Sequence, residues 1–316
     1  MVIYLALSLN RIVKPQSDLL NKSATIFSDE KSATKRLYVE GKKPKLMTSD
    51  FKYMIRNIKK IYRLPSSLIK TIKLIKSDQN KNKNLLTSTE FKQLQELLIS
   101  LEVEEYGFFE VTPEKIFKGY GVPHRFALVL SIPMNPDSFK SAPSIECQLE
   151  VARVYASTGN AANRVAEFLQ SKGYGASPNH SMGGQLDYSM ACEWAGIGTV
   201  GRHSMAITPR SGACHRISIV YVGIDNLHEF IQPNTHELEW VKSFCKKCGK
   251  CIRKCPTRAI LDRPVIQDGT YSTKIIYENC CEGFTKYGCG ICIEECPFTT
   301  IGYEKSKYNF ENKPTK

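Results

Sequence analysis

Nine of the chain's 12 cysteines lie close together near its C-terminal end, between Cys245 and Cys296. Residues 245–256 have the spacing Cys-x2-Cys-x2-Cys-x3-Cys-Pro, and residues 281–297 have the spacing Cys-x7-Cys-x2-Cys-x3-Cys-Pro. Three thiolates on one short loop can bind three corners of a cubic iron–sulfur cluster, and this spacing is typical of [4Fe–4S] sites. The two motifs therefore predict electron-transfer chemistry.

In proteins with two such motifs, the fourth cysteine of each motif binds the cluster of the other motif. Two clusters are therefore predicted, each held by three cysteines of one motif and one cysteine of the other. The predicted ligands of the first cluster are Cys245, Cys248, Cys251 and Cys296. Those of the second are Cys255, Cys281, Cys289 and Cys292. The neighbouring Cys280 is an alternative to Cys281.

A structural zinc site is the other chemistry that clustered cysteines can support. Zinc sites generally use two separated cysteine pairs, often with histidine, and a third close cysteine followed by Cys-Pro does not suit one tetrahedral ion. Disulfides are typical of small secreted proteins and do not suit a chain of 316 residues with reduced thiols. The scattered Cys147, Cys192 and Cys214 are expected to be buried apolar thiols.

The net charge of +13 is confined to one segment. Residues 31–83 hold 16 Lys and Arg against three acidic residues, which accounts for the whole excess. Such a segment can bind tRNA phosphates, an anionic membrane surface or an acidic partner, or it can be a solvated lysine-rich helix face. The first residues form only a short apolar run, which predicts neither a signal peptide nor a membrane span and indicates a cytoplasmic protein.

Hydrophobic periodicity predicts the elements that must position these cysteines. Apolar residues recur at three- and four-residue steps in the predicted helices, which cover residues 48–76, 87–101, 145–172 and 189–195. Short apolar runs predict buried strands at residues 126–132 and 217–222. Residues 1–45 lack a strong periodic signal.

The segment from Ala191 to Pro209, Ala-Cys-Glu-Trp-Ala-Gly-Ile-Gly-Thr-Val-Gly-Arg-His-Ser-Met-Ala-Ile-Thr-Pro, precedes the cysteine motifs. It is followed by Gly212, Arg216 and a strand, and then by the first motif. This order resembles the cobalamin-dependent iron–sulfur reductases, which comprise the reductive dehalogenases and the epoxyqueuosine reductases. The resemblance extends from about Phe108 to about Phe298. The sequence Glu-Gly-Phe after Cys281 also fits the family pattern, which favours Cys281 over Cys280 as a ligand.

The resemblance implies an α+β fold with a nitroreductase-like corrinoid-binding domain followed by a ferredoxin-like domain that holds two [4Fe–4S] clusters. The expected domains are a basic, mostly helical N-terminal extension at 1–104, the corrinoid and substrate domain at 105–238, the dicluster domain at 239–305 and a tail at 306–316.

The resemblance also implies where cofactor and substrate bind. The residues expected near a cobalamin or related cobamide are Gly196, Gly198, Gly201, Arg202, Thr208 and Arg216. The dehalogenases use a tyrosine with a basic neighbour as proton donor. The candidates for that role are Tyr188, His180 and Asp187. Tyr188 is the first choice, because the second cysteine motif is closer to the dehalogenase pattern.

The implied function is that of a cytoplasmic reductase, which passes electrons through two clusters to a corrinoid for dehalogenation-type chemistry on an organic substrate. A low-potential donor such as ferredoxin or flavodoxin is the expected partner. One alternative is epoxyqueuosine reductase-like modification of tRNA. Another is a dicluster electron-transfer protein without corrinoid.

Overall fold

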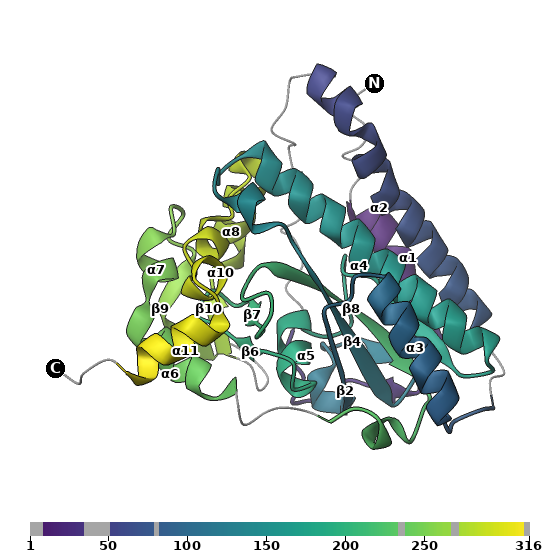
Figure 1. Cartoon of the computed structure of the whole chain (residues 1–316). Coiled ribbons are helices and arrows are strands. Elements are labelled where there is room, and N and C mark those ends of the chain that lie inside the picture. The colour runs from purple at the N-terminus through teal and green to yellow at the C-terminus, as the bar shows by residue number, and fades with distance from the viewer. Residues whose placement is uncertain (1–8, 35–50, 79–81, 233–237, 267–271, 313–316) are drawn as a thin grey trace.

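The computed structural model describes residues 9–34, 51–78, 82–232, 238–266 and 272–312. A four-stranded sheet lies at its centre, in the order β2-β4-β8-β5, and each neighbouring pair is antiparallel (Figure 1). The strands are β2 (Glu105–Glu110), β4 (Phe126–Pro133), β8 (His215–Val222) and β5 (Ala176–Asn179). Leu130 on β4 lies opposite Tyr106 on β2 and Ser218 on β8. The strands predicted at 126–132 and 217–222 are thereby confirmed.

Alternate residues of the central strands face two different apolar cores, as the pleat of a strand requires. Leu128 and Leu130 belong to the core shared with helices α3 (Ser88–Ser100) and α4 (Ile145–Ser171). Ala127 and Val129 belong to the core shared with the short helix α5 (Tyr188–Trp194). The sheet is therefore buried on both faces, which explains why its central strands are continuous apolar runs.

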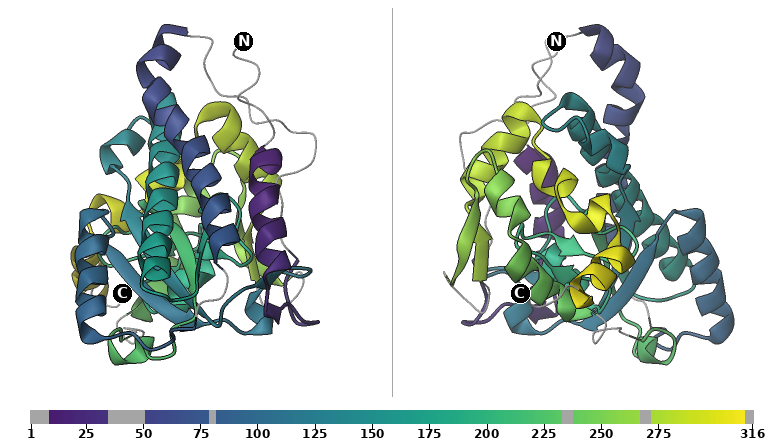
Figure 2. Two further views of the ribbon diagram at one scale, coloured as in Figure 1. Left: turned by 90° about the vertical axis from the view of Figure 1, so that its right-hand side faces the viewer. Right: turned by 60° about the vertical axis from the view of Figure 1, so that its left-hand side comes forward.

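Four helices lie side by side in the order α3, α4, α2 (Phe51–Ser77) and α1 (Leu9–Lys22), as the left view of Figure 2 shows. Helix α4 begins where the Ser144 hydroxyl accepts a hydrogen bond from the Cys147 amide at 3.2 Å. Helix α3 begins with a capping box between Thr87 and Glu90. The helices predicted at 48–76, 87–101, 145–172 and 189–195 are confirmed, whereas helix α1 was not predicted.

The prediction of an N-terminal extension is not confirmed, because side chains from this part of the chain form buried contacts with the central domain. Thr71 on α2 donates to the Asn163 side-chain oxygen on α4 at 2.8 Å. Asp78, just after α2, accepts from Ser177 on β5 at 2.5 Å and lies 2.6 Å from the His124 ring. Helix α2 is therefore part of the folded body, although its sequence is strongly basic.

The cysteine-rich region packs beside the end of the sheet (Figure 1). Its elements are α6 (Trp240–Cys248), α7 (Lys250–Lys254), β9 (Ile260–Ile266), β10 (Ser272–Ile275), α8 (Tyr277–Tyr287), α9 (Ile291–Glu294), α10 (Pro297–Thr300) and α11 (Tyr303–Glu311). A small hairpin of β6 (Thr199–Val200) and β7 (Ala206–Ile207) lies between this region and α5.

The predicted boundaries at 105, 239 and 306 stay predictions, although helix α11 runs across the last of them. Among the described helices, none combines the length and the apolar sequence that a membrane crossing needs. The nitroreductase-like character of the central domain also stays a prediction.

Candidate functional site

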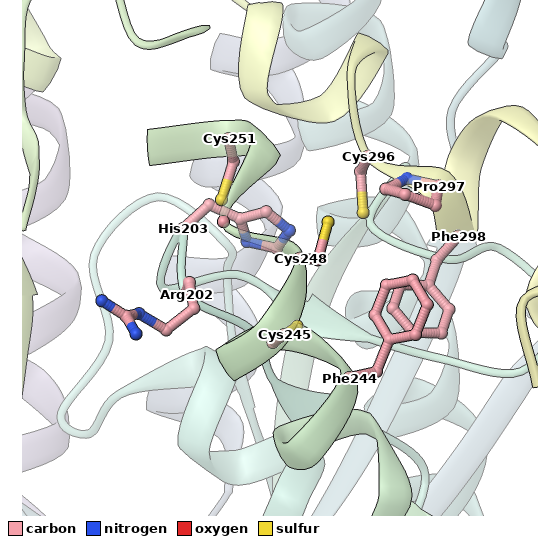
Figure 3. Close-up of a pocket in the computed structure, with 10 residues that line it drawn as sticks. Arg202, His203, Phe244, Cys245, Cys248, Cys251, Cys296, Pro297 and Phe298 are labelled. Carbon is pink, nitrogen blue, oxygen red and sulfur yellow. The ribbon is translucent and has the colours of Figure 1, made fainter. Parts of the chain in front are cut away.

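Four cysteines from the two motifs line one pocket of about 280 Å³, part of it open to solvent (Figure 3). They are Cys245, Cys248, Cys251 and Cys296, the set predicted to hold the first cluster. The other lining residues are Arg202, His203, Phe244, Gly249, Pro297 and Phe298. Among the described residues, no group of His, Cys, Asp or Glu side chains is arranged to hold a single metal ion.

Local backbone geometry brings these thiols together. Gly249 has a left-handed conformation with φ 55°, which ends α6 and starts α7 at a sharp angle. Cys296 has an extended conformation, and Pro297 then opens helix α10. In the wall of the pocket, the ring centroids of Phe244 and Phe298 lie 4.9 Å apart. This aromatic contact joins the elements that carry the two halves of the ligand set.

A second group of thiols surrounds Cys255 in the adjacent region. Burial raises the pKa of Cys280 to about 11, with smaller contributions from the neighbouring thiols of Cys255, Cys289 and Cys281. The pKa of Cys292 is raised well above its usual value by burial and then by Cys280, Cys289, Cys251 and Cys255. Cys280 therefore lies close to Cys255, Cys289 and Cys292, and the choice between Cys280 and Cys281 as a ligand of the second cluster stays a prediction.

Cys255 has hydrogen-bond donors already directed at its sulfur. The Ala259 amide donates to the Cys255 Sγ at 3.2 Å, and the Thr257 hydroxyl lies 3.6 Å from it. Burial alone would raise the pKa of Cys255, but these contacts outweigh it and lower the pKa below its usual value. Such donors stabilise a thiolate, which is the form that binds iron.

The remaining three cysteines are buried, as expected. Cys147 and Cys192 are fully buried, and Cys214 is nearly so. Burial raises the pKa of both Cys147 and Cys214 to about 12. These thiols are protonated at neutral pH and pack in the two cores described above.

Five of the six residues predicted to bind a corrinoid lie in or next to the β6–β7 hairpin. Gly196, with φ 68°, turns the chain from α5 into the β6–β7 hairpin. A Cβ atom on Gly198 would lie 3.0 Å from the Ile207 oxygen, so this glycine permits close backbone packing. Arg202 lines the four-cysteine pocket and donates to the Leu261 oxygen at 3.1 Å. The Thr208 hydroxyl accepts from the Ser211 amide, which shapes the next turn.

Arg216 lies elsewhere, on β8, where its guanidinium is 5.3 Å from the ring centroid of Tyr155 on α4. Its Nη1 donates to the His215 oxygen at 2.9 Å, while its buried Nε has no hydrogen-bond partner in the described part of the chain. The Ser218 hydroxyl, two residues along the same strand face, is also buried without a partner there. Two buried donors on one strand face suit a bound polar ligand.

His180 and Asp187 have structural roles that argue against acid catalysis. Met182 donates its amide to the His180 Nδ1 at 3.1 Å, and the His180 Nε2 lies 2.9 Å from the Ser67 hydroxyl. Burial lowers the pKa of His180 to about 3, so its ring is neutral at pH 7. Asp187 caps helix α5 by accepting from the amides of Ser189 and Met190.

The hydroxyl of Tyr188 is also held by hydrogen bonds. Its hydroxyl donates to the Asn179 side-chain oxygen at 2.5 Å and lies 2.7 Å from the His180 backbone oxygen. Burial, followed by the nearby phenols of Tyr221 and Tyr155, raises the pKa of Tyr188 well above 10. The sequence interpretation missed Tyr155, because a tyrosine inside an apolar helix carries no local signal of function.

Comparison with known proteins agrees with these observations. Residues 238–261 match the family model described as a 4Fe-4S binding domain. The chain is 28% identical over 214 residues to a tetrachloroethene reductive dehalogenase of Dehalobacter restrictus, covering 63% of this chain and 37% of that protein. It is 27% identical over 139 residues to an epoxyqueuosine reductase of Cellulophaga algicola, covering 41% of this chain and 42% of that protein.

Among solved structures, a reductive dehalogenase reported with a mechanism for B12-dependent dehalogenation superposes with a TM-score of 0.63 at 16% identity. The match covers 92% of this chain and 47% of that one. A second solved reductive dehalogenase, in complex with 3-bromo-4-hydroxybenzoic acid, gives a TM-score of 0.61 at 16% identity and covers 91% and 46% of the two chains. The fold is therefore shared, while this chain spans less than half the length of these proteins.

Proposed function

We propose that this chain, a member of the cobalamin and iron–sulfur reductase family, passes electrons through two [4Fe–4S] clusters to a corrinoid that reduces an organic substrate. The observation that carries the proposal is the pocket lined by Cys245, Cys248, Cys251 and Cys296 beside a second group of four thiols. Eight thiols in two adjacent groups match the donor set of two cubane clusters. Dehalogenation-type chemistry is preferred because the dehalogenase fold covers nearly the whole chain.

The residues present also suit a large polar cofactor in the central domain. Arg216 Nε and Ser218 Oγ are buried donors without partners among the described residues, and Tyr155 lies beside Arg216. A bound corrinoid would supply the strongly reducing centre that breaks a carbon–halogen bond. Arg216 and Ser218 would then bind polar groups of cofactor or substrate.

Tyr155 is the proton donor that the geometry favours. Reductive removal of a halide leaves a carbanion-like product, which needs a proton from a nearby side chain. When the Tyr155 hydroxyl gives up its proton, the guanidinium of Arg216 close to its ring stabilises the negative charge that remains. Tyr188 lacks such a cation in its described surroundings, and its hydroxyl proton is held by Asn179.

Reduction of an epoxide on a tRNA base is the second candidate function. It is supported by the similarity to epoxyqueuosine reductases and by the basic segment of residues 31–83. A dicluster electron-transfer protein without corrinoid is the remaining alternative. Activity on halogenated substrates, activity on epoxyqueuosine-containing tRNA and binding of a cobamide are the measurements that distinguish these three functions.

Anaerobic reconstitution with iron, sulfide and a cobamide tests the proposal. We expect about eight iron and eight sulfide per chain, as two cubane clusters require, and corrinoid absorption bands that stay with the protein through gel filtration. Stoichiometric zinc, or about four iron, would contradict the two-cluster assignment. Full clusters without retained cobamide would favour the electron-transfer alternative.

We further propose that an acidic electron donor, such as ferredoxin or flavodoxin, binds over the first cluster. Lys246 and Lys247 are exposed between the ligands Cys245 and Cys248, and Arg253 and Lys254 are exposed before Cys255. By contrast, helix α8, which carries Cys280, exposes Glu278 and Glu282 against one exposed cation, Lys286. This asymmetry steers a negatively charged donor toward the four-cysteine pocket.

The double substitution Lys246→Glu/Lys247→Glu should slow cluster reduction by reduced flavodoxin about tenfold or more at low salt, because it replaces attraction by repulsion. Stopped-flow absorbance under anaerobic conditions measures this rate, and the difference should shrink as ionic strength rises. The matched control, Lys92→Glu/Lys118→Glu, changes two exposed lysines on the central part of the chain and should have little effect. Equal slowing in both variants would indicate a general charge effect and refute a local docking site.

A further inference from the structure

His203 lies at the tip of the β6–β7 hairpin and lines the four-cysteine pocket. Its side chain is buried, with 5% of its surface exposed. Figure 3 shows the imidazole on the side of the pocket where the sulfurs of Cys248 and Cys251 lie. The sequence interpretation assigned no role to this residue, and the proposed electron path does not account for it.

The hydrogen bonds of the His203 ring determine which nitrogen carries the proton. The Met205 amide donates to Nδ1 at 3.2 Å, so Nδ1 is the acceptor and the neutral ring carries its hydrogen on Nε2. That Nε2 is buried and has no hydrogen-bond partner within the described part of the chain. Buried donors without acceptors are rare in native proteins, and each needs an explanation such as a bound group that accepts the hydrogen bond.

The hairpin holds the ring rigidly in this position. The Gly201 amide donates to the Met205 oxygen at 2.9 Å and closes the loop, in which Ser204 has a left-handed φ of 62°. A Cβ atom on Gly201 would lie 2.9 Å from the Cε1 of His203 and 2.8 Å from the Cδ1 of Ile207. Glycine at this position therefore leaves room for the imidazole to pack against its own loop. The left-handed Ser204 is the strained backbone position in this loop.

We infer that the His203 Nε2–H donates a hydrogen bond to a sulfur of the cluster held by Cys245, Cys248, Cys251 and Cys296, and thereby raises its reduction potential. The inference rests on the proposed function, since it needs that cluster. Reduction adds negative charge to the cluster and its sulfurs, so a fixed donor stabilises the reduced form more than the oxidised form. His203 thus acts through the cluster, by tuning its reduction potential, and does not take part in covalent chemistry.

The test is a redox titration of the anaerobically reconstituted protein, followed by electron paramagnetic resonance of the reduced clusters. His203→Leu and His203→Phe both remove the donor, and we expect the potential of one cluster to fall in each. A tenfold loss in the equilibrium constant for reduction corresponds to about 59 mV for this one-electron couple. The other cluster is an internal control and should keep its potential. His203→Gln restores an N–H donor and should recover most of the shift.

A second measurement needs no substitution. Wild-type protein labelled with ¹⁵N-histidine should show a weak magnetic coupling between one histidine nitrogen and a reduced cluster. Unchanged potentials in the Leu and Phe variants at full iron content, or absence of the nitrogen coupling, would overturn the inference. Failure of the proposed function is distinguishable, because the wild-type protein itself would then bind too little iron and sulfide for two clusters.

Discussion

Replacing Cys280 by serine should remove about four of the eight iron atoms expected for two cubane clusters, whereas Cys281→Ser should keep them. The reason is the direction of the two side chains on α8. Neighbouring residues on an α-helix point about 100° apart, so only one of the two can face a given group. The thiol of Cys280 shares its surroundings with Cys255, Cys289 and Cys292.

Iron and acid-labile sulfide per chain, measured after anaerobic reconstitution, give the result directly. Cys281→Ser is the matched control, because it makes the same chemical change one residue away on the same helix. Loss of iron from the Cys281 variant with full content in the Cys280 variant would restore the ligand set expected from the sequence. Retention of all iron in both single variants would show that neither thiol is required.

The spacing of Cys245, Cys248 and Cys251 indicates that these three thiols lie together, because this part of the pocket is built locally. Cys245, Cys248 and Cys251 lie on two short helices joined at Gly249, and their spacing alone places them on one concave turn. The choice between Cys280 and Cys281 could not be made in this way. It depends on the rotation of α8 about its axis, which is set by packing against the rest of the molecule.

In the N-terminal segment, the composition did not reveal the contacts that the structure shows. Its lysines and arginines suggested a separate charged extension, but charge describes only the exposed face of a helix. Helix α2 also carries Thr71, which is fully buried against Asn163, and Leu68, which is buried in the same interface region. Sequence composition does not reveal such contacts, since each partner is an ordinary residue until the two helices are placed side by side.

The catalytic candidates were sought just before the glycine-rich turn, because related enzymes suggested that stretch. In the structure, His180 forms a hydrogen bond with Ser67 on α2, and Asp187 caps helix α5. Tyr155 comes from the middle of α4 and meets Arg216 only because α4 packs across β8. A long-range contact of this kind follows from the tertiary fold and not from local sequence.

Tyr155→Phe should lower turnover by a factor of about 10² to 10⁴, the usual contribution of a positioned general acid, while Tyr188→Phe should have a much smaller effect. Tyr155 has a guanidinium 5.3 Å from its ring centroid, which stabilises the charge left after proton transfer. The proton of Tyr188 is held by the Asn179 oxygen at 2.5 Å, and burial raises the pKa of Tyr188 well above 10. Donating that proton would leave a buried phenolate without a described cation beside it.

Halide release from tetrachloroethene and from 3-bromo-4-hydroxybenzoic acid, with a chemical reductant in excess, measures turnover without the protein donor. Iron and corrinoid content must match the wild type in both variants, so that a loss of rate reports proton transfer. At corrinoid content matched to the wild type, Arg216→Gln should reproduce much of the Tyr155→Phe loss, because the phenolate would lose its cation. The two losses should not add in the double variant, since both substitutions disable one step. Full activity of Tyr155→Phe together with an inactive Tyr188→Phe would return the role to Tyr188, and would require the hydrogen bond to Asn179 to break when substrate binds.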